Sequence, residues 1–189
     1  MLSVLDIFRI GIGPSSSHTV GPMRISQRFW LRLAKLNYLP QTNRIRIIFR
    51  GSLAFTGIGH GTPRAGQLGL LGFEPETIDL DIAEDALKAL ASTKSFLRDG
   101  YAVAFDPAKD VVLDYDQPSG LHPNEMEMQA LDTAGTQIYS RTYYSTGGGF
   151  TASHAQLSRP AKNDRVSAGD IQAAHSFGSA TELLDICGK

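Results

Sequence analysis

Residues Arg44–Arg50 have the sequence RIRIIFR, in which apolar side chains partly alternate with arginines. Alternation, together with β-branched and aromatic residues, predicts a β-strand. Ahead of this strand, amphipathic spacing predicts a short helix over Leu2–Ile10 and a longer helix from Gly21 to about Tyr38, with Pro22 at its first position. The strand is therefore expected to follow two helices.

After the strand, a glycine-rich loop is expected over Gly57–Gly61. A helix is predicted over Thr62–Leu71, with Thr62 as its N-cap and Gly72 ending it. A further helix is predicted over Ile82–Leu97.

The later part of the chain is rich in strand patterns separated by turn residues. The predicted strands are Tyr101–Phe105, Val111–Tyr115, Glu125–Leu131 and Gln137–Tyr144. Helices early and antiparallel strands late predict an α+β fold, a mostly antiparallel sheet with helices packed on it.

The chain has 189 residues, of which 42% are hydrophobic and 20% charged, as is typical of a globular protein. One compact domain is the default at this length, and we expect it over residues 1–152. Residues 153–178 are polar and weakly patterned, which predicts a linker. Residues 179–189 look like the start of a helix that leads into another part of the protein.

The formal net charge of −1 gives no indication of a nucleic-acid or anionic-membrane partner. We find neither an apolar stretch long enough to cross a membrane nor a signal peptide, so a cytoplasmic location is expected. The single cysteine, Cys187, excludes a disulfide framework and a multi-cysteine metal site within this chain, and no metal ligand is predicted.

The first candidate site is the loop Gly11–Thr19, which gathers hydroxyls and an imidazole directly before a predicted helix start. Hydroxyls and free backbone N–H groups at a helix start suit an anion such as a carboxylate or phosphate. The alternative is a capping loop whose hydroxyls satisfy only local backbone groups. The polar residues concerned are Ser15, Ser16, Ser17, His18 and Thr19.

The second candidate is His60, which glycines flank on both sides. A histidine there can act as a general base, because its ordinary pKa lies near ~6.5. The alternative is a surface histidine in a flexible loop.

The third candidate is the run Tyr143–Phe150, where Gly147–Gly149 can present backbone N–H groups to an anion. A β-bulge or a close strand crossing would explain the same glycines. A fourth, weaker candidate is His122-Pro123-Asn124, a turn that more often caps local backbone than touches a substrate.

Taken together, these motifs resemble the β part of bacterial iron–sulfur L-serine dehydratases, also called L-serine deaminases. The similarity runs from about residue 2 to residue 150, and Ser179–Leu184 resembles the segment that leads into the α part of that family. The motifs that carry it are VLDIF (4–8), GIGPSSSHTVGPM (11–23), GSLAFTG (51–57), GHGT (59–62) and YYSTGGGF (143–150).

The resemblance implies an enzyme of amino-acid degradation and gluconeogenesis that converts L-serine to pyruvate and ammonia by α,β-elimination, without pyridoxal phosphate. In that family an α part holds a [4Fe–4S] cluster, which acts as a Lewis acid on the substrate hydroxyl. The implied partners are L-serine, an α domain or α subunit, and further copies of the chain. The fold implied is similar to the allosteric substrate-binding domain of phosphoglycerate dehydrogenases.

The resemblance also implies roles for individual residues. The catalytic candidates are His60, His18 and Thr62, and which histidine is the base stays open. The Ser15–Thr19 run would grip the substrate carboxylate. The remaining candidates for the substrate pocket are Ser145, Gly147, Gly148 and Asn124.

The sequence departs from the family pattern in three places. Pro63 stands where the family often has Asp, and Glu125 stands where it often has a small residue. The cluster cysteines are missing, so this chain is expected to lack the α part and to be inactive alone. Two other functions remain open: a non-catalytic effector-binding module for an amino acid or phosphate, and a structural or dimerisation domain.

Overall fold

The computed structural model describes residues 11–159 and 179–187, so the helix predicted over Leu2–Ile10 lies outside the described residues. Contacts divide the chain into two units, residues 1–158 and residues 159–189. In the second unit residues 159 and 179–187 are described, and they include helix α8, Ala180–Cys187, which confirms the helix predicted there.

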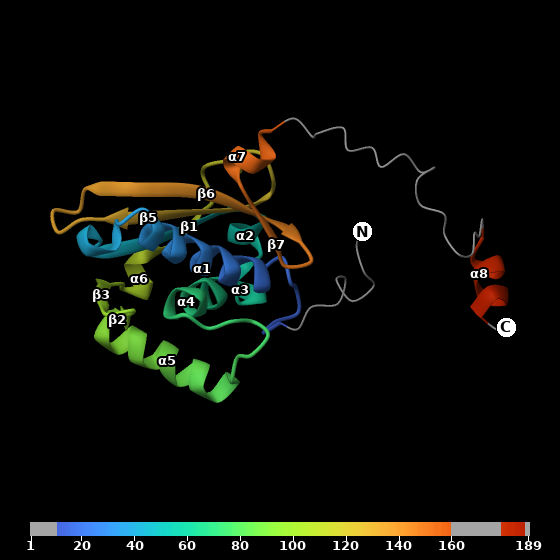
Figure 1. The fold of residues 1–189 in the computed structure, drawn as a ribbon, viewed down its shortest axis with the longest axis horizontal. Coiled ribbons are helices and arrows are strands. Elements are labelled where there is room, and N and C mark those ends of the chain that lie inside the picture. The colour runs from blue at the N-terminus through green and yellow to red at the C-terminus, as the bar shows by residue number, and fades with distance from the viewer. Residues whose placement is uncertain (1–10, 160–178, 188–189) are drawn as a thin grey trace. The chain divides into compact units, whose positions relative to one another are not determined.

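The first unit contains a seven-stranded sheet in the order β2-β3-β1-β5-β6-β7, with β4 paired to β1 beside this path (Figure 1). β1 pairs in parallel with β3 and β4, whereas the other strand pairs are antiparallel. The sheet is therefore mixed but mostly antiparallel, and the predicted α+β class is confirmed. The strands are β1 (Arg44–Gly51), β2 (Ser95–Arg98), β3 (Tyr101–Ala104), β4 (Val111–Asp114), β5 (Asn124–Leu131), β6 (Gln137–Gly147) and β7 (Phe150–Ser153).

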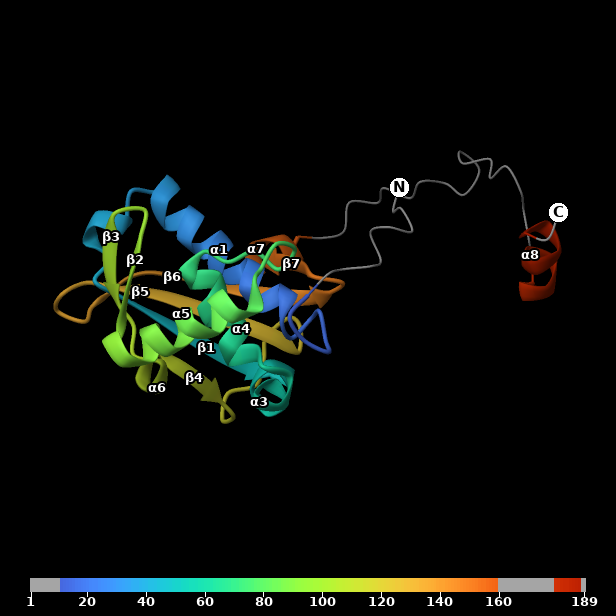
Figure 2. The same cartoon turned by 90° about the horizontal axis from the view of Figure 1, so that it is seen from below.

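Helices α1, α4 and α5 lie on one side of this sheet (Figures 1 and 2). The helical elements of the unit are α1 (Val20–Lys35), the 3-10 helix η2 (Leu39–Gln41), α2 (Ser52–Phe55), α3 (Gly57–His60), α4 (Thr62–Leu71), α5 (Leu80–Thr93), α6 (Pro107–Asp110) and α7 (His154–Leu157).

The main core lies between α1 and the sheet. Alternation along β1 buries Ile45, Ile47 and Phe49, which belong to the same core cluster as Phe29 and Leu33 of α1. Full burial of each such side chain contributes about 1.5–3 kcal/mol.

The opposite face of the sheet is polar. Arg50 of β1 contacts three carboxylates there, those of Asp114, Glu125 and Glu127, at 2.9, 3.0 and 2.9 Å. The partial alternation in RIRIIFR therefore reflects one helix-covered face and one charged face. Glu125, which departs from the family pattern, is a member of this ion-pair group.

The loop predicted over Gly57–Gly61 is wrong, because the segment is helical. The backbone N–H of Thr56 donates to Ser52 O at 3.0 Å, and the N–H of His60 donates to Thr56 O at 3.3 Å. Gly57 is buried, and a Cβ on it would lie 3.2 Å from Thr62 Cβ. The glycine thus permits close packing within a helix, whereas the glycine-rich pattern predicts a loop.

Other boundaries differ by a few residues. α1 begins at Val20, which puts Pro22 at the third helical position, and it ends at Lys35. The N-cap of α4 is Gly61 in a left-handed conformation, so the prediction of Thr62 as the cap is wrong and Thr62 is the first helical residue.

The predicted helix over Ile82–Leu97 is also too long at its C-terminal end. Lys94 has a φ of 54°, which ends α5 at Thr93. Ser95 then starts β2, whose pairing with β3 outweighs the helical pattern.

Structure continues into the first residues of the predicted linker. Ser153 ends β7 and His154–Leu157 forms α7. The side-chain oxygen of Gln156 accepts from Ser153 N at 2.9 Å and from Arg28 at 2.6 Å, which explains this turn of helix. Residues 160–178 lie outside the described part, so the division into domain and linker stays a prediction.

The contact between α1 and α4 predicts a sharp effect of one methyl group. In Gly69→Ala the new Cβ would lie 2.1 Å from Met23 O, a backbone atom that cannot turn away. We expect a loss of about 1–3 kcal/mol in the free energy of unfolding, the usual cost of overpacking. Urea unfolding measures it.

Gly59→Ala is the matched control, because nothing lies within 4 Å of its Cβ position. It should leave stability unchanged or raise it by about 0.5–1 kcal/mol, as alanine does in helices. Equal stability of the two variants would contradict the packing described for α1 and α4.

Candidate active site

The loop before α1 folds into a turn that holds His18 in place. The backbone N–H groups of His18 and Thr19 donate to Ser15 O at 3.1 and 3.0 Å, and the Thr19 hydroxyl donates to the same oxygen at 2.8 Å. The N–H of Gly21 donates to Ser16 O at 2.9 Å. These N–H groups are therefore already paired, so the serine hydroxyls are the better donors for an anion.

His18 is buried, with 8% of its surface exposed, and polar groups contact both of its ring nitrogens. Nδ1 lies 3.0 Å from Ser17 Oγ and 3.3 Å from Ser15 Oγ. Nε2 lies 3.2 Å from Ser52 Oγ and 3.0 Å from Thr56 Oγ1.

The proton of His18 can be assigned from these contacts. The Thr56 hydroxyl lies 2.8 Å from Ser52 O, a carbonyl that can only accept; with its proton directed there, Oγ1 accepts from His18 Nε2. In that arrangement neutral His18 carries its proton on Nε2, and Nδ1 accepts from a serine hydroxyl.

His60 has the opposite tautomer. Its Nδ1 lies 2.9 Å from Thr56 O, a carbonyl that can only accept, so Nδ1 carries the proton. The lone pair of neutral His60 is thus on Nε2, the nitrogen that can take a proton from another molecule. Thr56 fixes both histidines, one through its hydroxyl and the other through its carbonyl.

The two imidazole rings lie side by side, with centroids 4.6 Å apart and planes inclined by 35°. Burial, and next to it the possible positive charge on His60, lower the pKa of His18. The structure therefore brings together the first two candidate motifs, which are far apart in the sequence.

The third motif reaches the same end of the sheet. Ser145 is fully buried against Gly21 in the first turn of α1, where a Cβ on the glycine would lie 2.0 Å from Ser145 Oγ. Gly147–Gly149 form the β6–β7 turn with φ values of 95°, 56° and 73°, and Gly149 O accepts from Arg24 at 3.0 Å. Only glycine adopts such a run without strain.

Asn124 links the motifs across the sheet. Its side-chain N–H group donates to Ser145 O at 3.0 Å, and it pairs in register with Gly51, next to Ser52. His122 Nδ1 accepts from Asn124 N at 3.1 Å, so this histidine serves the local turn.

Two hydroxyls in this region are buried without a hydrogen-bond partner among the described residues, Thr62 Oγ1 and Ser145 Oγ. Unpaired buried polar atoms cost free energy, typically about 1–3 kcal/mol, and they often mark functional positions. Thr62 is the first residue of α4, two positions after His60.

Sequence reasoning assigned no role to Ser52 or Thr56. Ser52, Thr56 and His60 are spaced four residues apart, which places them on one face of a helix. That spacing could have identified Ser52 and Thr56 as neighbours of His60. A loop over Gly57–Gly61, as predicted, would not place the three residues on a common face.

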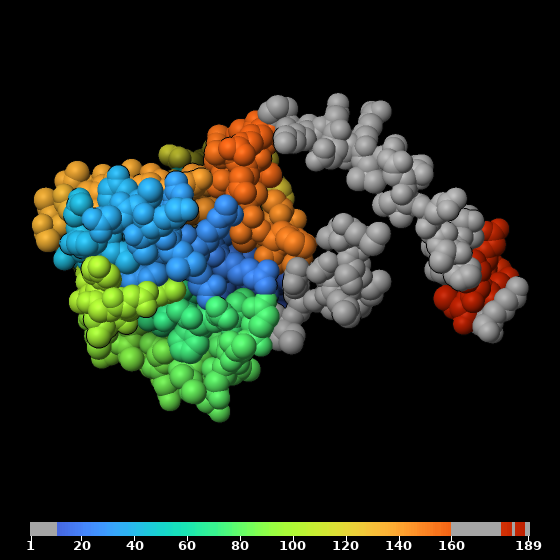
Figure 3. Space-filling model, in the orientation of Figure 1, coloured from blue at the N-terminus to red at the C-terminus, as the bar shows by residue number. Residues whose placement is uncertain are grey.

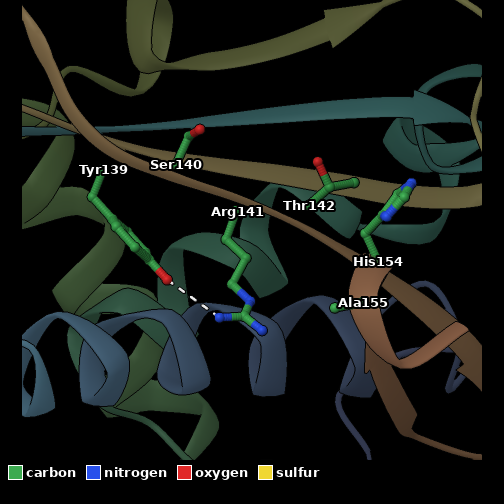
Figure 4. Close-up of a pocket in the computed structure, with 6 residues that line it drawn as sticks. All are labelled: Tyr139, Ser140, Arg141, Thr142, His154 and Ala155. Carbon is green, nitrogen blue, oxygen red and sulfur yellow. Dashed lines mark hydrogen bonds between the residues drawn. The ribbon is translucent and has the colours of Figure 1, made fainter. Parts of the chain in front are cut away.

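A surface hollow elsewhere holds none of the predicted site residues. Its volume is about 430 Å³, and it lies along β6 and α7 (Figure 4). It is lined by Tyr139, Ser140, Arg141, Thr142, His154 and Ala155.

Within the described ranges, 11–159 and 179–187, no group of three or more His, Cys, Asp or Glu side chains is arranged to hold a metal ion. None of the helices described is long and apolar enough to span a membrane.

Fold and geometry together define an α+β domain that carries a histidine- and hydroxyl-rich centre at one end of its sheet. A family model, the serine dehydratase beta chain, matches residues 3–156. The chain belongs to this family, which confirms the resemblance seen in its motifs.

Three relatives illustrate the match. The L-serine dehydratase of Streptomyces coelicolor is 39% identical over 184 residues, which cover 97% of this chain and 40% of that protein. The L-serine dehydratase of Haemophilus influenzae is 35% identical over 188 residues, which cover 99% of this chain and 40% of that protein. L-serine dehydratase 1 of Escherichia coli is 35% identical over 191 residues, which cover 100% of this chain and 40% of that protein. The chain thus spans about 40% of the length of these relatives.

The environment of His18 predicts its titration. Its pKa should lie below the ordinary value of 6.5, and NMR titration of the imidazole signals measures it. A lowered pKa means that the unfolded chain binds the extra proton more readily, so the stability from neutral His18 is present above pH 6.5 and is lost as the pH falls.

In His60→Gln the neighbouring positive charge is gone, and the pKa of His18 should move upward while burial still holds it below 6.5. His154→Gln, an exposed histidine of α7, should not move it. A His18 that titrates at or above 6.5 in the unaltered chain would contradict this account of the site.

Proposed function

We propose that this chain is the substrate-handling β part of an L-serine dehydratase, which converts L-serine to pyruvate and ammonia. The observation that supports it best is the pair of histidines held by Thr56 in opposite tautomers, beside a row of serine hydroxyls. This arrangement offers donors for a carboxylate and one free ring nitrogen for a proton.

In this proposal one hydroxyl of the pair Ser15 and Ser17 donates to His18 Nδ1, and the remaining hydroxyl protons of Ser15–Ser17 bind the carboxylate of L-serine. Hydrogen bonds to a charged group are about twice as strong as neutral ones, so a few hydroxyls suffice to orient it. Thr19 holds the loop through its bond to Ser15 O. His18, neutral and contacted at both nitrogens, positions the serines and Thr56.

His60 is the proposed base. Its Nε2 takes the α-proton of L-serine, and the electron pair of that C–H bond forms the Cα=Cβ double bond while hydroxide leaves Cβ. The proton held on His60 is then returned to the hydroxide, which departs as water, and His60 is neutral again. The aminoacrylate so formed tautomerises to the imine, which water hydrolyses to pyruvate and ammonia. The water released in the first stage balances the water consumed in the second.

The remaining predicted residues complete the pocket in this proposal. The unpaired hydroxyls of Thr62 and Ser145 are available to substrate or to ordered water. Asn124, bonded to Ser145 O, and the turn residues Gly147 and Gly148 shape the wall around them.

A [4Fe–4S] cluster is part of the proposal but not of this chain. Such clusters are held by several cysteine thiolates, and the sequence contains one cysteine. The residues of this chain therefore do not fit the cluster, and an α part outside the chain would hold it and stabilise the departing hydroxide.

Exposed apolar side chains beside His60 support such a partner. Phe55 and Ile58 are 68% and 72% exposed, and the Phe55 ring packs 5.3 Å from that of half-exposed Tyr115. Contiguous exposed apolar groups next to a site are typical of a surface that another domain covers.

The wider setting follows the same proposal. The enzyme would act without pyridoxal phosphate, in amino-acid degradation and gluconeogenesis, in the cytoplasm and as a homo-oligomer. We further propose kinship of the fold with the allosteric substrate-binding domain of phosphoglycerate dehydrogenases.

The test of the base is turnover by the chain fused to, or mixed with, the α part of a dehydratase. His60→Asn should lower kcat by about 10²- to 10⁴-fold, the usual contribution of general base catalysis. His154→Asn, on exposed α7, is the matched control and should keep full activity. Retained activity in His60→Asn would reject His60 as the base, and binding of L-serine without turnover in the assembled protein would favour an effector module.

Ser16→Ala tests the carboxylate role. Within residues 11–159 and 179–187 the side-chain hydrogen bonds of this loop involve Ser15, Ser17, His18 and Thr19 but not the Ser16 hydroxyl, so its loss should cost the free protein little. If it binds the carboxylate, kcat/KM should fall about 10- to 100-fold, as expected for a hydrogen bond to a charged group. Ser95→Ala, at the far strand β2, is the control, and an equal response of the two variants would contradict the assignment.

A further inference from the structure

The charges of this chain are distributed unevenly. Between Ile7 and Phe73 the sequence contains no Asp or Glu. Several basic residues of this stretch find carboxylates from later in the chain: Arg24 pairs with Glu76, Arg44 with Asp110, Arg50 with Asp114, Glu125 and Glu127, and Arg64 with Glu84.

Four basic residues on α1 and β6 differ from these. Arg28, Arg32 and Lys35 of α1 and Arg141 of β6 form no ion pair with a carboxylate in the part of the chain that the structure describes. No acidic residue occurs anywhere in α1, β6, β7 or α7, the elements around them.

These cations converge on one cavity of about 190 Å³. Positions 28, 32 and 35 lie on one face of α1 because they are four and three residues apart. Figure 4 shows Tyr139 and Arg141 projecting from β6 toward α1, and Figure 3 shows these two elements side by side at the surface. The cavity is lined by Arg28, Leu31, Arg32, Lys35, Arg141 and Tyr143.

The cavity walls are held in place. The guanidinium carbons of Arg28 and Arg141 lie 5.5 and 5.9 Å from the centroid of the Tyr143 ring, within cation–π range. Arg28 also donates to Thr151 O at 3.3 Å. Preorganised guanidinium groups lose little entropy when a ligand binds.

Arg32 contributes a donor without a partner. Its Nε is buried and makes no hydrogen bond to any described residue. Such a buried donor is unfavourable unless a ligand or water accepts from it.

The pKa of Tyr139 reflects the positive electrostatic potential beside the cavity. Burial alone would raise the pKa of its hydroxyl, but hydrogen bonding from Arg141 and Arg32 outweighs burial and lowers it. The Arg141–Tyr139 distance is 3.3 Å. The cluster thus favours negative charge even on a phenol.

We propose that the cavity between α1 and β6 binds an oxyanion with two or more negative charges, such as phosphate or a phosphate ester. The planar fork of a guanidinium matches the oxygens of phosphate, and several such groups meet here without a carboxylate partner among residues 11–159 and 179–187. The hollow of about 430 Å³ on the other side of Arg141 leaves room for the organic part of a larger ligand.

This basic cavity is distinct from the histidine centre. The histidine centre lies at the first turn of α1, and Arg32 lies twelve residues beyond Val20, about 18 Å along the helix. The anion is therefore an additional ligand rather than the proposed substrate, and its binding does not depend on the dehydratase function.

A small anion fits better than a second copy of the chain. β7 pairs only with Tyr143–Gly147 of β6, and pairing of two copies through the uncovered first half of β6 would bring two cationic clusters together, which like-charge repulsion opposes. The cavity is also of a size that suits a small ligand.

Isothermal titration of the whole chain with inorganic phosphate tests the proposal, with ionic strength held constant by sodium chloride. We expect saturable binding at one site. Arg32→Gln and Arg141→Gln should each weaken it about tenfold or more, because each removes charge-assisted hydrogen bonds. Arg64→Gln, which removes the same charge from the pair with Glu84, is the matched control and should bind as the unaltered chain does.

Several outcomes would overturn the proposal. These are phosphate binding no tighter than chloride, unchanged binding in both cavity variants, or equal weakening by Arg64→Gln, which would indicate nonspecific attraction. Binding of a poly-glutamate peptide without binding of phosphate would also overturn it and would indicate a protein partner. If circular dichroism shows that Arg32→Gln does not fold, Lys35→Gln replaces it, because the Lys35 side chain is exposed. Weaker phosphate binding by Lys35→Gln would then support the proposal, and unchanged binding would contradict it.

Discussion

The site depends on one residue, Thr56, which contacts two histidines at once. Its hydroxyl lies 3.0 Å from His18 Nε2, and its carbonyl lies 2.9 Å from His60 Nδ1. A carbonyl only accepts, so His60 carries its proton on Nδ1; with the Thr56 hydroxyl proton directed to Ser52 O, His18 carries its proton on Nε2. His18 thus has a structural role, and His60 keeps the lone pair on its Nε2 available to accept a proton.

The fold brings the necessary pieces to one end of the sheet. β1 ends at Gly51 and turns directly into α2, which carries Ser52. β5 begins at Asn124, in register with Gly51, and β6 ends near Ser145, which packs against the first turn of α1. Buried Gly57 then allows α3 to approach α4 closely, which sets His60 beside His18. The site therefore depends on packing around glycines as much as on its polar residues.

Much of this was predictable from the sequence, and the failures have physical causes. Alternation and turn residues located the strands, and the motifs identified His18, His60 and Ser145. Glycine disfavours helices in isolation, which predicts a loop over Gly57–Gly61, whereas in the fold Gly57 packs closely against Thr62 and the segment is helical. That error concealed the Ser52–Thr56–His60 spacing. The basic cavity between α1 and β6 was beyond sequence reasoning, because which arginines find carboxylates depends on the tertiary fold.

The most direct test of the central claim is a crystal structure of the assembled dehydratase, this chain with its α part, containing bound L-serine or an unreactive analogue. The account predicts the ligand carboxylate among the hydroxyls of Ser15–Ser17 and His60 Nε2 pointing at the α-carbon, near hydrogen-bond reach of about 3 Å. A ligand whose α-carbon faces another base, with His60 Nε2 turned away or bonded to the protein, would contradict it.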